Sequence, residues 1–262
     1  MTELFDTHSH LDFSRFDRDR EEVLDRARHE GVKYIITIGA GGGPENMENA
    51  LRLAAEHENM WATAGVHPHD AKHMDDQTLQ RIRTLAADPK VVAIGEIGLD
   101  YAKEYSPRKE QQQAFRDQMK LARELDLPVV IHDRDAHEDV MDVLKKDGAG
   151  EAGGIMHCYS GTADLALRFI AMGFYISFPG VITFKNAANL HETAGAVPAE
   201  KILIETDCPF LAPQPYRGKR NEPAYVKLVA EKIAELRGTS YQEIARQTTA
   251  NAMRAFRLSG TG

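Results

Sequence analysis

Short apolar segments recur along the chain, and a longer amphipathic stretch follows most of them. The short segments are rich in Val, Ile and aromatic side chains and are bounded by Gly or Pro, which is typical of buried β-strands. We predict strands at residues 4–10, 34–39, 61–67, 91–99, 128–133, 153–159, 174–179 and 202–207.

The stretches between these strands carry apolar residues every three or four positions, as expected for one face of a helix. Several begin with helix-starting residues. Ser106-Pro107 is a capping residue followed by proline, and Ser240 with Glu243 forms a capping box. We predict helices at 17–30, 44–58, 107–125, 162–172, 222–237 and 239–257.

This alternation predicts an α/β protein with a parallel sheet. A doubly wound sheet and a (β/α)8 TIM barrel both alternate in this way, and the eight strands favour the barrel. The chain shows no linker or change of composition, so we predict a single domain over residues 1–258, followed by a flexible tail at 259–262.

Composition narrows the class of protein without identifying it. The chain has 262 residues, 42% of them hydrophobic and 27% charged, which excludes a disordered or coiled-coil protein. The net charge of −8 argues against a protein that binds polyanions over its whole surface. The N-terminus lacks the pattern of a signal peptide, and Cys158 and Cys208 are too few for a disulfide framework. We therefore expect a cytoplasmic protein with no membrane contact and no obligate protein partner.

Ligand-type side chains stand where five of the predicted strands end. In a barrel, these strand ends meet on the face that carries the active site. His8 and His10 point the same way because side chains alternate along a strand. The residues are His8, His10, Glu96, His132, His157 and Asp207.

Four histidines and two carboxylates are too many for one closed tetrahedral metal, and they suit two divalent cations that share a carboxylate. Zn, Mn, Fe or Co fit these ligands, and Mg prefers all-oxygen sites. A single His-x-His pair would be weak evidence, since a histidine in a strand is usually a satisfied core residue. The buried carboxylates of Glu96 and Asp207 need a cation nearby, and no arginine lies inside those strands.

Three further residues have a functional and a structural interpretation. Glu205 and Asp6 each lie two positions before a candidate ligand, so either could orient a ligand histidine or act as a buried hydrogen-bond acceptor. Tyr159 shares the face of His157 and suits either substrate contact or core packing. Cys158 and Cys208 follow candidate ligands, and we expect both to be buried, reduced core residues.

The loop after the last strand carries the densest basic run, with Arg217, Lys219 and Arg220. Barrels often bind phosphate at this position, so the run could hold a phosphodiester. A short run of charges is also common in solvated loops.

The chain resembles the TatD family of metal-dependent hydrolases, often described as deoxyribonucleases. The matching segments cover the chain in family order: FDTHSHLD (5–12), GVHPH (65–69), AIGEIGLDY (93–101), PVVIHDRDA (128–136), GGIMHCYSG (153–161), LIETDCPFL (203–211) and RGKRNEP (217–223).

The resemblance implies a TIM barrel of the amidohydrolase type with two metals. His8, His10, Glu96 and Asp207 would hold the first metal, and Glu96 would bridge to a second metal held by His132 and His157. His67 and Asp100 also match recurring family residues. We expect His67 near the substrate and Asp100 behind the ligands.

The leading hypothesis is metal-dependent phosphodiester hydrolysis on DNA, with a water activated by both metals, Glu96 as the bridge and Asp207 as the proton acceptor. Single strands or frayed ends suit a barrel mouth, and the resemblance suggests digestion from the 3′ end. The alternative is hydrolysis of a C–N or ester bond in a small substrate. A non-catalytic metal-binding scaffold is a third hypothesis.

Overall fold

The structure is a computed structural model that describes residues 2–148 and 152–258. The chain divides into two compact units, which we call the terminal unit (Met1–Thr37 with Cys158–Gly262) and the central unit (Ile38–His157). The predicted tail at 259–262 lies outside the described residues. The domain bounds therefore stay a prediction.

Eight strands follow one another in chain order along one sheet. They are β1 (Leu4–Ser9), β2 (Val32–Thr37), β3 (Met60–Ala64), β4 (Val91–Asp100), β5 (Val129–Arg134), β6 (Gly154–Met156), β7 (Phe174–Phe178) and β8 (Ile202–Ile204). The α-helices are α1 (Arg20–His29), α2 (Met47–Glu56), α3 (Asp76–Leu85), α4 (Arg108–Leu125), α5 (His137–Asp147), α6 (Ala163–Ala171), α7 (Ala188–Ala196), α8 (Val226–Arg237) and α9 (Tyr241–Ala255).

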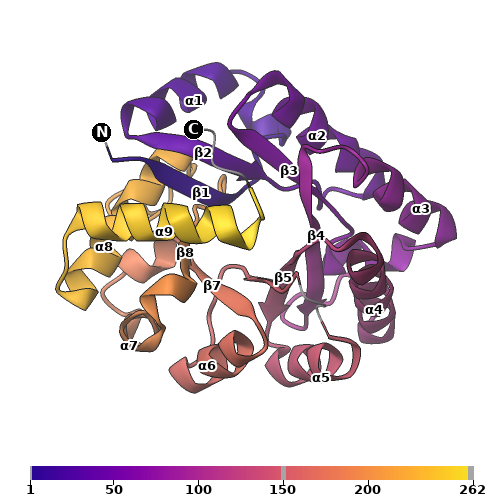
Figure 1. Cartoon of the computed structure of the whole chain (residues 1–262). Coiled ribbons are helices and arrows are strands. Elements are labelled where there is room, and N and C mark those ends of the chain that lie inside the picture. The colour runs from indigo at the N-terminus through magenta and orange to yellow at the C-terminus, as the bar shows by residue number, and fades with distance from the viewer. Residues whose placement is uncertain (1, 149–151, 259–262) are drawn as a thin grey trace. The chain divides into compact units, whose positions relative to one another are not determined.

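In the terminal unit, the first and last parts of the chain share one parallel sheet. Ile176 of β7 pairs with Ile202 of β8, and Leu4 of β1 pairs with Val32 of β2. The two pairs are joined because Ser9 forms a parallel bridge with Cys208. Helix α9 packs against β1 and β8 (Figure 1). The two ends of the chain are thereby held together, which brings the end of β1 beside the end of β8.

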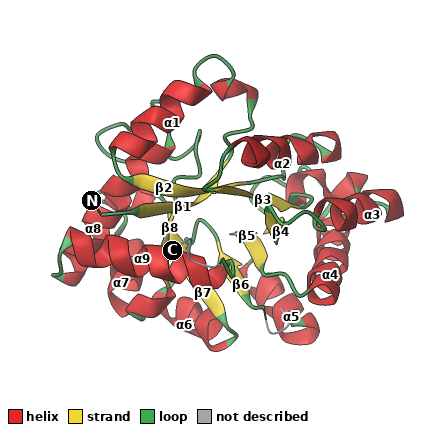
Figure 2. Cartoon of the chain, turned by 45° about the horizontal axis from the view of Figure 1, so that its top comes forward, coloured by secondary structure: helices red, strands yellow, loops and turns green. Residues whose placement is uncertain are grey.

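In the central unit, β3 to β6 form consecutive parallel pairs. Helix α4 packs on β4, and α5 packs on β4 and β5 (Figure 2). The backbones of β4 and β5 approach closely at Gly98, where a Cβ atom would lie 2.0 Å from the carbonyl oxygen of His132. With φ at +137°, this position also requires glycine. The close approach lets side chains near the ends of both strands meet.

All eight predicted strands and all six predicted helices have counterparts in the structure. Helices α3, α5 and α7 are additions. Helix α3 buries only Ile82 and Leu85, and α7 contains Gly195, so neither shows a long apolar stripe. Among the described residues, no helix combines the length and apolar character needed to cross a membrane.

Strands β6 and β8 are shorter than predicted. They end at Met156 and Ile204, before the ligand-type residues that we had placed inside them. The backbone turns into the left-handed region at Cys158 (φ +45°) and Asp207 (φ +55°), which breaks the extended conformation. Two of the candidate ligands, His157 and Asp207, therefore stand on turns that follow strands.

Candidate metal centre

The terminal unit brings three of the predicted ligands together. His8 lies in β1, His10 directly follows β1, and Asp207 follows β8. Main-chain hydrogen bonds set this register: the N–H of Asp207 donates to the carbonyl of His8 (2.9 Å), and the N–H of His10 donates to the carbonyl of Cys208 (2.8 Å). The side chains then meet, with Oδ1 of Asp207 3.6 Å from Nε2 of His8 and 3.5 Å from Nε2 of His10.

These separations fit a metal ion better than direct hydrogen bonds. Both exceed the usual range for an N–H···O bond. Two atoms bound to one zinc ion, each about 2.0–2.2 Å from it, lie roughly 3–3.5 Å apart. Ligand atoms of His8, His10 and Asp207 all lie within 4.8 Å of one another. Two buried imidazoles and a carboxylate form a donor set that suits Zn, Mn, Fe or Co.

The turn that carries Asp207 is fixed by a buried amide. Asn221 is fully buried, and its Nδ2 donates to the carbonyls of Thr206 and Phe210, at 2.7 Å each. The main-chain N–H of Asn221 also donates to the carbonyl of Pro209 (3.1 Å). Asn221 therefore contacts the backbone on both sides of Asp207, and this candidate ligand sits on a turn with fixed ends.

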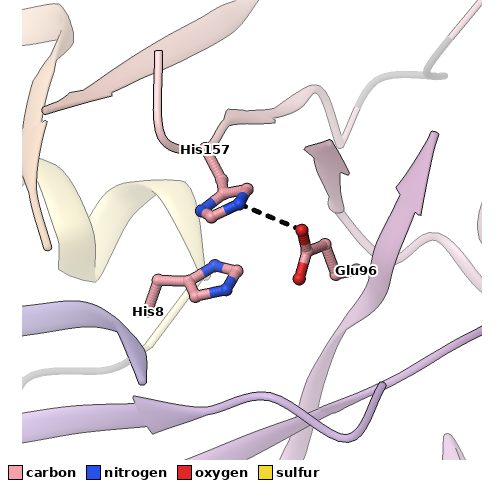
Figure 3. A group of neighbouring side chains, drawn as sticks. All are labelled: His8, Glu96 and His157. Carbon is pink, nitrogen blue, oxygen red and sulfur yellow. Dashed lines mark ion pairs between the residues drawn. The ribbon is translucent and has the colours of Figure 1, made fainter. Parts of the chain in front are cut away.

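In the central unit, three histidines surround the carboxylate of Glu96. Oε1 of Glu96 lies 2.6 Å from Nδ1 of His132 and 3.4 Å from Nε2 of His67. The same oxygen lies 3.0 Å from Nε2 of His157, and Figure 3 shows the two side chains pointing toward one another. Ligand atoms of His67, Glu96 and His132 lie within 4.8 Å of one another.

The three histidines around Glu96 keep its carboxylate ionised. Burial alone would raise its pKa, but the charges and hydrogen bonds of His157, His67 and His132 hold the pKa of Glu96 well below its ordinary value. Burial would lower the pKa of His132, but its hydrogen bonds with Asp100 and Glu96 raise that pKa to about 9. Burial lowers the pKa of His67 to about 4. His67 is therefore neutral at neutral pH.

Asp100 contacts two histidines of the central unit, His132 and His69. Its Oδ2 lies 3.2 Å from Nε2 of His132 and 2.8 Å from Nε2 of His69, and its Oδ1 accepts from the N–H groups of Ala102 and Lys103. This leaves Nδ1 of His132 directed at Glu96, as in a carboxylate–histidine–metal arrangement. The role of Asp100 behind the ligands stays a prediction. We had not singled out His69, although its place in His67-Pro68-His69 was a signal.

Two glutamines of α4 also hold the ligand-bearing backbone and were missed. Gln111 accepts from the N–H of Asp100 (2.8 Å) and donates to its carbonyl (3.1 Å). Gln118 makes the same pair of bonds with Val66, which precedes His67 (2.7 and 3.1 Å). Both glutamines are buried on the inner face of an amphipathic helix. A polar residue at a core position of the helix was the available signal.

Asp6, Glu205 and Tyr159 make hydrogen bonds within the terminal unit. Asp6 accepts from the N–H and hydroxyl of Thr206, and burial raises its pKa to about 8. Glu205 accepts from the N–H of Cys158 (2.7 Å) and the hydroxyl of Ser177 (2.6 Å). Tyr159 is buried, and its hydroxyl donates to the carbonyl of Thr162 (2.6 Å).

The two cysteines differ from each other. Cys208 is buried as predicted, and burial holds the pKa of its thiol well above the ordinary value. The prediction of a buried Cys158 was wrong: the residue is only half-buried, because it stands on a left-handed turn and not inside a strand. Neither cysteine forms a disulfide.

The basic residues that follow β8 contact other side chains of the terminal unit. Arg220 donates to both carboxylate oxygens of Asp19 (2.9 and 2.5 Å). The Arg217 guanidinium lies over the ring of Phe184, and the Lys219 ammonium lies over the ring of Tyr216. A role of the run in binding phosphate stays a prediction, and Arg220 also has a structural partner.

The sequence of the chain is similar to a known protein family and to individual members of it. A family described as TatD related DNase matches residues 5–257. The protein named "Uncharacterized metal-dependent hydrolase YabD" of Bacillus subtilis is 49% identical over 256 residues, covering 98% of this chain and all of that protein. The "3′-5′ ssDNA/RNA exonuclease TatD" of Cronobacter sakazakii is 38% identical over 259 residues, covering 97% of each chain.

The fold is also shared with a solved structure. The crystal structure of YjjV, a TatD homolog from Escherichia coli K12, superposes with a TM-score of 0.91 at 32% identity, covering 98% of each chain. Together with the strand order, this confirms the predicted (β/α)8 barrel class. The resemblance seen in the sequence is confirmed as well, and the chain belongs to the TatD-related family of metal-dependent hydrolases.

Proposed function

We propose that this hydrolase is a deoxyribonuclease that cleaves phosphodiester bonds from the 3′ end of single-stranded or frayed DNA. The names of relatives such as the Cronobacter exonuclease support this substrate class. The observation that carries the chemistry is the His8–His10–Asp207 group, whose separations of 3.5 and 3.6 Å fit metal ligation. We place the protein in the cytoplasm as part of this proposal.

The proposal assigns two divalent cations to the two ligand groups. His8, His10 and Asp207 would hold one, His132 and His157 would hold the other, and Glu96 would bridge them. Support comes from the barrel fold, in which the carboxyl ends of the strands meet on one face. When bound, such a pair of cations lowers the pKa of water and neutralises charge on the phosphoryl oxygens.

The residues of the chain have separate tasks in this scheme. Glu96 is kept anionic by its histidines, as a bridge between cations requires. Asp207 presents Oδ1 to both imidazoles, and we assign its Oδ2 to accept the proton of the attacking water. Asp100 fixes the ring of His132 through Nε2, with Nδ1 directed at Glu96, so His132 would be oriented to help hold the second cation. The role of His67 is contact with the substrate beside the metals.

The test begins with metal analysis of the protein as purified. The metals are then removed with a chelator, and Zn, Mn, Mg, Co or Fe is added back singly. Single-stranded DNA labelled at the 5′ or 3′ end is the substrate. We expect hydrolysis only with metal, progressive shortening of the 5′-labelled strand, and early release of a labelled mononucleotide from the 3′-labelled strand.

Two other outcomes would contradict the proposal in different ways. Hydrolysis of a dihydropyrimidine or a carboxylic ester, with no hydrolysis of DNA or bis-p-nitrophenyl phosphate, would support the alternative hydrolase. Absence of turnover on all these substrates, in protein that contains its metals, would support a non-catalytic metal-binding scaffold.

A further inference from the structure

Two phenylalanines lie beside the ligand His10. The ring centroid of Phe13 is 4.7 Å from that of His10, and the centroid of Phe210 is 6.1 Å from it. The two phenylalanine rings meet edge to face at 6.3 Å. Phe210 is 44% exposed. An exposed aromatic surface therefore adjoins the proposed metal ligands within the terminal unit.

The exposed ring of Phe210 stands on a fixed backbone. Its N–H donates to the carbonyl of Asp207 (2.9 Å), and its own carbonyl accepts from Asn221 (2.7 Å). The amide that brackets the metal ligand thus also holds the residue that carries the ring. A ring held in this way loses little conformational freedom when a ligand covers it.

A cation lies next to this aromatic surface. The Arg15 guanidinium is 5.8 Å from the centroid of Phe210. Arg15 is exposed and makes no ion pair with any residue in the described parts of the chain, whereas Arg220 is paired with Asp19. Arg15 is therefore available for a phosphate in a chain whose net charge is −8.

We propose that Phe13, Phe210 and Arg15 form a base-stacking subsite for the nucleotide bound at the His8–His10–Asp207 group. This inference rests on the proposed function and deepens it. Every nucleobase has a flat π face, so stacking on a phenylalanine ring gives affinity without selecting sequence. The contact with His10 places such a base close to the phosphate at the metal, and Arg15 would pair with a phosphate of the same strand. Stacking of this kind requires an unpaired base, which accounts for a preference for single strands or frayed ends.

The test uses metal-replete protein and a single-stranded oligonucleotide with phosphorothioate linkages at its 3′ end, which slow hydrolysis. A 2-aminopurine at the 3′-terminal position reports stacking through the loss of its fluorescence. We expect Phe210→Ala to raise the Kd of this strand by about 5- to 150-fold and to abolish the loss of fluorescence. Phe210→Trp should retain both properties.

Two controls separate stacking from a general loss of structure. Leu167→Ala removes another exposed apolar side chain, on α6, and should leave the Kd unchanged. A strand whose terminal residue is abasic should bind wild type and Phe210→Ala equally, because it has no base to stack. Arg15→Ala should weaken both strands and should reduce the dependence of the Kd on salt.

The outcomes distinguish the subsite from the nuclease proposal. Equal affinity of wild type and Phe210→Ala for the aminopurine strand would overturn the subsite, even if both proteins digest DNA. An equal loss of affinity for the abasic strand would also overturn it, and would indicate a structural effect. A normal aminopurine signal in a protein that hydrolyses no DNA would support the subsite and contradict the nuclease proposal.

Discussion

Replacing Asn221 by alanine tests whether the buried amide positions a metal ligand. The change removes the 2.7 Å donor from the buried carbonyl of Thr206 and from the partly buried carbonyl of Phe210. Loss of the buried partner costs about 1–3 kcal/mol and loss of the partly buried one costs less, so we expect the free energy of unfolding to fall by about 1–4 kcal/mol. Because Asp207 stands between the two released carbonyls, we also expect metal affinity to fall by about 10–100-fold.

The chain supplies a matched control at the other end of β8. Asn251 is also fully buried, and its Nδ2 donates to the carbonyls of Ala199 and Ile202, at 2.8 Å each. Asn251→Ala therefore removes the same two bonds where the strand begins, away from Asp207. We expect a comparable loss of stability and an unchanged metal affinity.

Both quantities are measured on purified variants. Urea unfolding in the presence of chelator gives the stability of the metal-free protein, since bound metal would add its own stabilisation. Calorimetric titration of the folded proteins with Zn gives the affinity. If both variants lose affinity equally, metal binding depends on overall stability and not on Asn221. If Asn221→Ala loses stability but keeps its affinity, the amide does not position Asp207.

Three further substitutions test other parts of the site. Glu96→Gln should abolish phosphodiester hydrolysis and lower the metal content while preserving the fold, because a neutral amide offsets less positive charge than a carboxylate. If the variant keeps two metals per chain and hydrolyses at a near-normal rate, Glu96 does not bridge the metals. Asp100→Asn should weaken metal binding by about 10–100-fold, measured by titration, because it loosens the ring of His132; an unchanged affinity would show that the ring is held without the carboxylate. Arg220→Ala should lower the free energy of unfolding by up to about 1 kcal/mol at neutral pH. Hydrogen bonds from Arg220 hold the pKa of Asp19 below its ordinary value. The ion pair therefore stabilises the fold fully above the ordinary pKa of aspartate, and this stabilisation is lost as the pH falls through the lowered pKa of Asp19. If the difference in stability between wild type and Arg220→Ala did not shrink in urea titrations at acid pH, the ion pair would not be its source.

The sequence predicted the elements because they follow from local pattern, and the same pattern located the candidate ligands. Apolar runs ended by Gly or Pro located the strands, and the polar residues at their carboxyl ends gave His8, His10 and Asp207, which the terminal unit does bring together. The alternation rule failed where the backbone leaves the strand. Asp207 and Cys158 occupy left-handed turns, so counting residues along an assumed strand does not give the direction of their side chains.

The supporting contacts could not be predicted in the same way. Asn221 and Gln118 form hydrogen bonds with main-chain groups that are distant in the sequence. The hydropathy pattern does not indicate which main-chain group such a side chain will bond to. The ion pair of Arg220 could not be predicted for a similar reason. A run of basic residues looks alike in the sequence whether all its charges face solvent or one of them, here Arg220, is paired with a distant carboxylate such as Asp19.

The two buried glutamines of α4 have a consequence for how such a scaffold can change. Gln111 and Gln118 bind the peptide groups of Asp100 and Val66, and not their side chains. These bonds from the helix to the backbone beside His67 and at Asp100 can therefore form whichever side chains stand there. Substitutions at these positions can change the side chains of the site while α4 keeps its hydrogen bonds to the main chain. A scaffold built in this way can diversify its substrates in evolution without first having to acquire a new framework.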